Sequence, residues 1–189
     1  MLTKHLTFLL ICAVSRFFDC VEGDQSVQLD YILEDFNNCA DIPDAKISFS
    51  GIDFEFKNYT FRVVNAKMEV KEDISKSSHG IEEITVCDSK RQSDSCQFFL
   101  STGLGGICED IGNEDSILYP LWNSVENFEK KCPIKQGIYD VKNAALTISD
   151  SEIWFPSYGK VQVRFDDGED MLLCIDMQFD VVRRRPRSV

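Results

Sequence analysis

The cysteines constrain the fold of this chain more than any other feature. Eight occur in 189 residues, and two of them, Cys12 and Cys20, lie in an N-terminal stretch typical of an export signal. The remaining six form an even set, which in an exported chain predicts three disulfides, each stabilising by about 2 to 4 kcal/mol. Spacing alone leaves the pairing open, because six cysteines can pair in many ways. The six are Cys39, Cys87, Cys96, Cys108, Cys132 and Cys174.

The N-terminus predicts a secreted, extracellular protein. Lys4 and His5 precede the apolar run Leu6–Val14, which matches a signal-peptide core and is shorter than the roughly 20 residues of a membrane span. Small residues permit cleavage after Ser15 or after Gly23. We favour Gly23, which removes both early cysteines, and predict a signal peptide over residues 1–23. The triplet that begins at Asn58 (Asn-Tyr-Thr) predicts N-glycosylation there.

Residues 24–182 are long enough for one domain with a substantial core. The chain has a net charge of −12, and four of its arginines lie in the basic C-terminal tail, residues 183–189. The body is therefore more acidic still, which argues against a nucleic-acid partner. This basic tail is typical of a chain end that lies in solvent. The alternative is that its arginines contact anionic lipid.

Alternation of apolar and polar residues predicts strands. Lys160–Phe165 and Leu173–Val181 alternate on either side of Asp-Asp-Gly, which predicts an antiparallel hairpin with one buried face. Similar segments recur upstream, so we expect an all-β, two-sheet antiparallel sandwich or cup. One short helix is the exception, because Leu118, Leu121, Trp122, Val125 and Phe128 follow helical spacing and Pro120 suits a first turn. The other predicted strands are Tyr31–Phe36, Lys46–Phe49, Phe54–Val64, Ala66–Ile74, Ile81–Val86 and Gly137–Ile148.

The sequence argues against catalysis. After the predicted signal peptide the chain has one histidine, His79, in a polar stretch, and it lacks the Gly-x-Ser-x-Gly motif of a nucleophile elbow. The cysteines lack the short spacing of a zinc site. The run Gly103–Gly106 lacks the lysine of a phosphate-binding loop and is expected to be a turn. We therefore expect neither an enzyme nor a bound cofactor or metal.

Aromatic residues point to an apolar ligand. The chain has 14 phenylalanines, and two clusters, Phe98-Phe99-Leu100 and Ile153–Gly159, place large apolar residues in succession. Consecutive side chains on a strand point to opposite faces, so some of these must face solvent, a partner or a cavity. They either close the ends of the core or form the lip of an apolar pocket, with Trp154 and Phe155 reaching a membrane interface.

Several motifs resemble the GM2 ganglioside activator and its MD-2-related lipid-recognition relatives. The segment Cys132–Tyr139 (CPIKQGIY) and the segment Leu172–Ile175 (LLCI) are similar to the C-terminal half of the activator. Asp35–Cys39 (DFNNC) and the stretch Val86–Phe98 resemble its first cysteine strand and its short disulfide loop. The resemblance extends from Tyr31 to Val182, and in length and layout the insect secreted CheA and CheB families, linked to chemosensory organs and pheromone perception, look most similar.

The resemblance implies a β-cup around an apolar cavity. It also implies the pairing that spacing leaves open: Cys39 with Cys174, Cys87 with Cys96, and Cys108 with Cys132. The activator has one further bridge before its Cys-Pro motif, and this sequence lacks those two cysteines.

These observations predict a secreted carrier of a lipid or other hydrophobic ligand. The resemblance further implies a role in pheromone or taste perception in an insect. The alternative is an extracellular interaction module that modulates a receptor or channel without a bound lipid. A lipid-cleaving enzyme is disfavoured by the single histidine. We expect a membrane surface or a sensory receptor as further partners. The large residues that border the predicted opening are the expected ligand contacts: Phe54, Phe56, Phe61, Phe98, Phe99, Leu121, Trp122, Trp154 and Phe155.

Overall fold

A computed structural model describes residues 28–58, 61–75, 78–91, 93–146 and 158–184. The chain divides into two compact units, one formed by residues 30–182 and the other by the chain ends, 1–29 and 183–189. Of the ends, only residues 28, 29, 183 and 184 are described, as the terminal residues of two strands. All that follows concerns the first unit. The predicted signal peptide and the last five residues of the basic tail lie outside the described residues.

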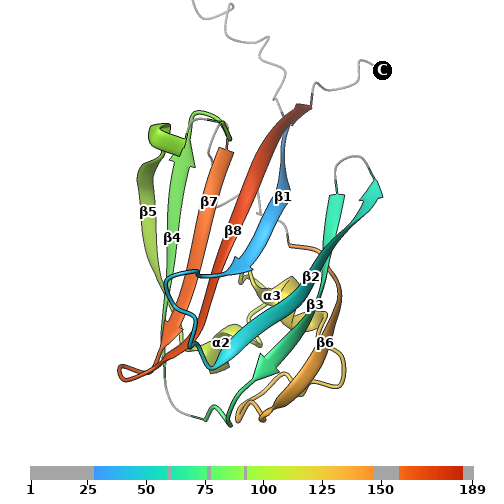
Figure 1. Ribbon diagram of the computed structural model, residues 1–189, viewed down its shortest axis with the longest axis vertical. Coiled ribbons are helices and arrows are strands. Elements are labelled where there is room, and N and C mark those ends of the chain that lie inside the picture. Colours follow the sequence, from blue (N-terminus) through green and yellow to red (C-terminus); the bar gives the residue numbers. More distant parts are fainter. Residues whose placement is uncertain (1–27, 59–60, 76–77, 92, 147–157, 185–189) are drawn as a thin grey trace, which may run out of the picture. The chain divides into compact units, whose positions relative to one another are not determined.

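Strands dominate the described chain, which confirms the all-β prediction (Figure 1). Two short α-helices and one turn of 3-10 helix connect them. In chain order the elements are β1 (Gln28–Asn38), β2 (Ile47–Asn58), β3 (Phe61–Val70), β4 (His79–Cys87), η1 (Ser93–Ser95), β5 (Gln97–Leu104), α2 (Ile107–Asp110), α3 (Tyr119–Asn123), β6 (Gly137–Ala144), β7 (Tyr158–Asp166) and β8 (Met171–Arg184).

Hydrogen bonding joins the eight strands into one open sheet, with the order β5-β4-β7-β8-β2-β3-β6 and with β1 also paired to β8. The expected division into two separate sheets is therefore replaced by one sheet with two halves. The large half contains β5, β4, β7, β8 and β1, and the small half contains β2, β3 and β6. The halves meet where β2 runs parallel to β8, at the pair Ile47 and Leu173.

The C-terminal hairpin forms as its alternation predicts. Val161 pairs with Met177 and Val163 with Ile175, and all four side chains are buried. The intervening polar residues on β7 lie on the opposite, partly exposed face. We call the buried side of each half its inner face and the other side its outer face.

The β2–β3 hairpin differs from the prediction in its boundaries. Gly51 was expected to separate two strands, but it lies inside β2 with a positive φ of 59°, at a register shift between Ser50 and Asp53. The chain reverses later, where Asn58 pairs with Phe61. A glycine can therefore mark a bulge as readily as a turn, because both need the same left-handed backbone.

The segment between Cys96 and Cys132 also differs from the prediction. It was expected to contain one helix, yet it begins with the strand β5 and has two helices. Gly103 and Leu104 belong to β5, so the expected turn over Gly103–Gly106 is wrong, and only Gly105 and Gly106 connect β5 to α2. In the sequence, the helical spacing of apolar residues continues beyond α3. In the structure, Val125 instead forms an isolated β-bridge with Val141.

Three disulfides link the expected cysteines, and their pairing is the one that the resemblance implies. Cys87 and Cys96 bridge β4 to the residue before β5, while Cys108 and Cys132 tie α2 to the segment before β6. The third, between Cys39 and Cys174, spans 135 residues of sequence and crosses from the end of β1 to β8. A bridge over so long a loop removes much of the conformational entropy of the unfolded chain.

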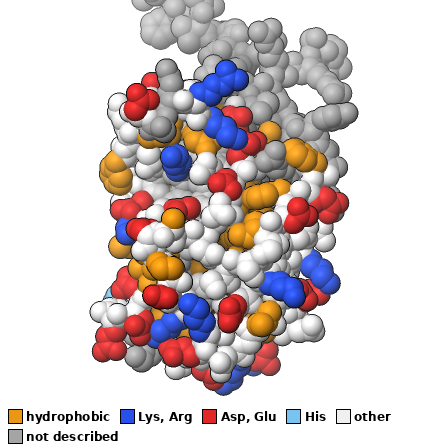
Figure 2. All heavy atoms as spheres, viewed as in Figure 1, with side chains coloured by type: hydrophobic (Ala, Val, Ile, Leu, Met, Phe, Trp, Pro, Cys, Tyr) orange, Lys and Arg blue, Asp and Glu red, His pale blue; other side chains and the backbone are white. Residues whose placement is uncertain are grey.

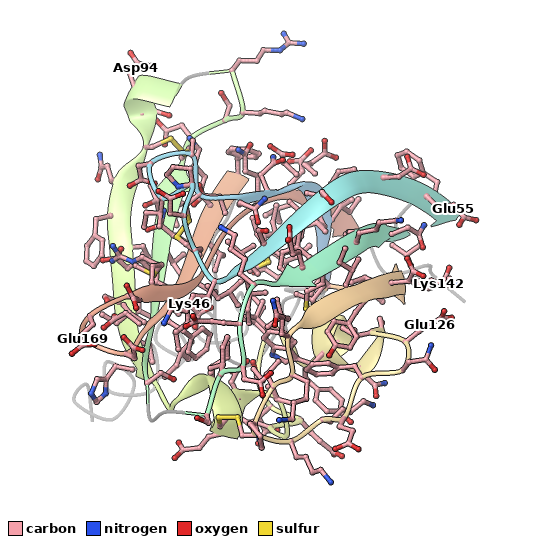
Figure 3. The ribbon with its side chains drawn as sticks, turned by 60° about the horizontal axis from the view of Figure 1, so that its bottom comes forward. Lys46, Glu55, Asp94, Glu126, Lys142 and Glu169 are labelled. Atoms are coloured by element: carbon pink, nitrogen blue, oxygen red, sulfur yellow. A yellow bond between two sulfur atoms is a disulfide. The ribbon has the colours of Figure 1, made fainter. Side chains whose placement is uncertain are left out.

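Lys46 ties together three connections at one end of the unit (Figure 3). Its ammonium group lies 2.8 Å from the Asp170 carboxylate, 2.7 Å from Glu72 and 3.8 Å from Asp167. The hydrogen bonds that Lys46 donates to Asp170 and then to Glu72 hold the pKa of Lys46 above its usual range. The cluster joins the start of β2 to the residues after β3 and to the β7–β8 turn.

Candidate functional site

The junction between the two halves determines how their inner faces are arranged. Ile47 and Leu173 form the parallel pair, and neither side chain is exposed. Next to this pair, the Cys39 N–H donates to the Cys174 carbonyl at 3.2 Å, and the same two residues form a disulfide. Beyond the junction β2 and β8 have no further register pair among the described residues, and β1 pairs with β8 instead. Each half thus keeps its own strand pairing.

The Asn38 side chain hydrogen-bonds the backbone edge of β2 at the point where β2 separates from β8. Its side-chain amide donates to the Phe49 carbonyl at 2.7 Å and accepts from the Phe49 N–H at 2.8 Å. A carboxamide presents one donor and one acceptor as a peptide group does, so it substitutes for a neighbouring strand. The rings of Phe36 on β1 and Phe49 on β2 meet edge to face with centroids 5.2 Å apart.

Replacing Asn38 by alanine should lower the free energy of unfolding by about 1 to 3 kcal/mol, because two partly buried backbone groups of Phe49 lose their partner. Asn37 is the matched control. It is exposed and hydrogen-bonds only the Asp35 side chain among the described contacts, so Asn37→Ala should change stability by less than about 0.5 kcal/mol. Urea denaturation followed by circular dichroism measures both, and equal losses would contradict this role for Asn38.

Aromatic side chains on the inner face of β2 become more exposed with distance from the junction. Ile47 is fully buried and Phe49 is 4% exposed. After the register shift, Phe54 pairs with Val64 on the same face and is half-buried. Phe56, two residues further, is 59% exposed. An apolar wall therefore runs along the small half from the closed core to solvent.

The inner face of the large half is a second apolar wall. Seven alternating side chains of β7 and β8 are at most 1% exposed, and Ile84 of β4 continues the face at 1%. The seven are Val161, Val163, Phe165, Leu173, Ile175, Met177 and Phe179.

The two helices close the interior next to these walls with a buried polar contact. Leu121 and Trp122 of α3 have no exposed surface, and the Trp122 indole N–H donates to the Asp110 carboxylate of α2 at 2.7 Å. Burial raises the pKa of Asp110, against the hydrogen bonds from Ser116 and Trp122 that favour its charged form. The Trp122 ring also stacks on Phe128. This end of the interior is therefore filled by the protein itself.

The structure distributes the predicted ligand contacts over separate places. Phe54 and Phe56 lie together on β2, whereas Leu121 and Trp122 belong to the closed end of the core. The remaining described pair lies on β5, at the far end of the large half: Phe98 is 66% and Phe99 is 53% exposed. Phe61 begins β3, but its side chain lies outside the described part, as do Trp154, Phe155 and the side chain of Asn58.

Ionisable groups do not gather into a reactive centre in the described part of the chain. His79 is exposed at the start of β4. The described residues contain no group of three or more metal-binding side chains. None of the described helices is long and apolar enough to cross a membrane.

No protein-family model matches this chain, and no curated protein matches it. The resemblance described above therefore depends on the quoted motifs.

Sequence reasoning missed the residues that build the junction and the closed end. No alternation of apolar and polar residues singles out Asn38. Its role depends on a hydrogen bond to Phe49, which is 11 residues away in the sequence. The Asp110–Trp122 contact was equally hidden, although a tryptophan and an acid on neighbouring short helices are a usual donor and acceptor.

Proposed function

We propose that this protein binds a lipid or another long apolar molecule between the two halves of its sheet and carries it outside the cell. The observation that best supports the proposal is the graded exposure along the inner face of β2, from buried Phe49 to half-buried Phe54 and 59% exposed Phe56. Aromatic side chains that are partly exposed on an inner face offer apolar surface that a guest could cover. In this proposal the halves form a cup, and β2 lines its mouth.

Apolar burial alone supplies enough affinity for such a guest. Each buried methylene contributes about 0.8 kcal/mol, so a chain of roughly twelve carbons contributes on the order of 10 kcal/mol before ordering costs. Micromolar binding requires about 8 kcal/mol. Selectivity for chain length is then coarse, because one methylene changes the affinity only about fourfold.

Three disulfides support the extracellular part of the proposal, since such bridges persist in oxidising compartments. The motifs shared with lipid-recognition proteins support the ligand class. A chemosensory role in an insect follows from the same resemblance and belongs to the proposal. Trp154 and Phe155 would contact a membrane from which the cargo is collected.

Organic extraction of the purified protein, followed by mass spectrometry, tests the proposal directly. We expect a co-purified lipid or hydrocarbon in amounts near one per protein molecule. Finding none, together with no uptake of a fluorescent fatty acid, would favour the rival function: an extracellular interaction module without a lipid. The fully closed end around Trp122 and the exposed phenylalanines of β5 are the observations that favour this rival.

Phe56→Ser should weaken binding of a fluorescent fatty acid about 10- to 100-fold, because it removes about 1.5 to 3 kcal/mol of apolar contact. Ile138→Ser is the matched control. Ile138 is 71% exposed, but it pairs with Glu69 on the outer face of the small half, so this variant should bind like the wild type. Titration by fluorescence displacement measures both, and equal affinity of the two variants would argue against the β2 wall as the ligand contact.

A further inference from the structure

One acidic residue lies on the otherwise apolar inner face of the large half. Glu82 of β4 pairs in register with Val163 of β7, whose side chain has no exposed surface. The next residue, Glu83, lies on the outer face, where its carboxylate pairs with Arg164 at 2.5 Å. Among the residues that register pairs place on the inner face of β4, β5, β7 and β8, Glu82 is the one with a charge.

The surroundings of Glu82 are closed in one direction and open in another. Towards the start of β4, a Cβ added at Gly80 would lie 2.5 Å from the Phe165 ring and 2.7 Å from Leu104, so these two side chains pack closely on the strand. On the β5 side, Glu82 pairs with Thr102, which is exposed. Figure 2 shows apolar side chains at the surface along this flank, on the left. The inner face is therefore closed before Glu82 along β4 and partly open beside it.

The Glu82 carboxylate lies at this boundary between closed and open surroundings. Its Oε1 atom is shielded from solvent, whereas the residue as a whole is half-buried. A charge in such surroundings is costly to desolvate, and a hydrogen bond to it is stronger than the same bond in water. A carboxylate has two oxygens with about four acceptor positions. It can therefore keep a contact within the protein and still accept a hydrogen bond from a guest.

We propose that Glu82 binds the polar head group of the guest, and that this head group donates a hydrogen bond: a hydroxyl group or a protonated amine on a long apolar chain. The inference rests on the proposed function, which supplies the guest. Ligand sites are lined mainly by apolar side chains, and a few polar groups among them fix the orientation of the ligand. Glu82 fits this pattern, because its neighbours Ile84 and Val163 are apolar and buried. A carboxylate head group would be repelled there.

The position of Glu82 also sets the orientation of the guest. Glu82, Val163 and Ile175 form one row across the sheet, next to the row that contains Leu173 of the junction. The head group would therefore lie close to the level of the junction, with the apolar chain directed along β7 and β8 towards the exposed end of β2. Thr102, in the same row as Glu82, offers a hydroxyl group as a second partner for the head group.

Displacement of a neutral fluorescent probe, N-phenylnaphthylamine, from the full secreted chain tests the head group. The competing ligands are dodecanol, dodecylamine and dodecanoate, whose apolar chains are alike, so differences in affinity report the head group. At neutral pH we expect dodecanol and dodecylamine to bind about 10- to 100-fold more tightly than dodecanoate, the factor that a hydrogen bond to a charged group gives. Whichever of the two binds more tightly identifies the head group as neutral or cationic.

Glu82→Gln keeps the size of the side chain but removes its charge, so dodecanoate should bind this variant within about threefold of dodecylamine. Glu83→Gln is the matched control, because it makes the same substitution on the outer face of the same strand. It should keep the wild-type order of affinities.

Equal affinity of the wild type for the three ligands would overturn the assignment and leave the proposed function in place, and this arm needs no variant. A preference that survives in Glu82→Gln, or that is lost equally in Glu83→Gln, would overturn it as well. A protein that binds neither the probe nor any of the three ligands would contradict the proposed function, and this inference with it.

Discussion

Replacing Cys39 and Cys174 together by alanine should lower the free energy of unfolding by about 5 kcal/mol, the value that chain entropy gives for a loop of this length. The bridge spans 135 residues and lies at the junction between the halves. Because small domains are stable by only about 5 to 15 kcal/mol, much of the variant should be unfolded at 37 °C. Guanidinium denaturation monitored by circular dichroism measures the loss.

The bridge between Cys87 and Cys96 provides the comparison. It closes a loop of only 9 residues, for which the same model gives about 2.5 kcal/mol. The double alanine variant at this bridge should therefore remain folded with about half the loss. If the two variants lose the same stability, the entropy of the unfolded chain does not account for the stabilising effect of the long bridge.

Trp122→Ala should cost about 3 to 5 kcal/mol, because Trp122 fills the closed end of the interior with no exposed surface. Trp122→Phe keeps most of the ring but removes the indole N–H, which leaves the buried Asp110 carboxylate with one donor fewer. It should cost about 1.5 to 3 kcal/mol, the usual value for a hydrogen bond to a charged group. Thermal and chemical unfolding would measure both, and a loss below 1 kcal/mol for the alanine variant would contradict this packing.

Asp110→Asn removes the charge from this contact but keeps the size of the side chain and its hydrogen-bond acceptor. The amide oxygen still accepts from Trp122, so the variant should stay folded. In the wild type, burial raises the pKa of Asp110 above its usual 3.8. The folded protein then binds a proton at a higher pH than the unfolded chain, so this group favours the folded state below about pH 4 and loses that advantage as pH rises through the raised pKa. Wild-type stability relative to Asp110→Asn should therefore increase on acidification.

Period-two alternation identified the strands that are buried on one face. β7 and β8 were predicted to within three residues of their ends, because apolar and polar residues alternate along them. β5 was missed since all but one of its side chains are exposed, so burial imposes no alternation on it. The helical spacing around Trp122 correctly identified buried residues but overestimated helix length, because Val125 was buried by a bridge to β6 instead.

The candidate site was less predictable than the strands. Large size alone selected Phe54 and Phe56, which do share the inner face of β2, together with Trp122, which belongs to the closed core. What separates these residues is their distance from the Ile47–Leu173 junction. That contact joins residues 126 positions apart, and no local pattern reports it. The disulfide pairing was the exception, because the resemblance supplied it.

The way the halves are joined affects how a guest could enter. Since β2 and β8 share one register pair, the proposed mouth could widen while every strand ladder within each half stays intact. Separation next to the junction would break the Asn38–Phe49 hydrogen bonds, which join β1 to β2, whereas separation further along would cost contacts between side chains. The long covalent bridge between Cys39 and Cys174 would hold the pivot of such an opening in place.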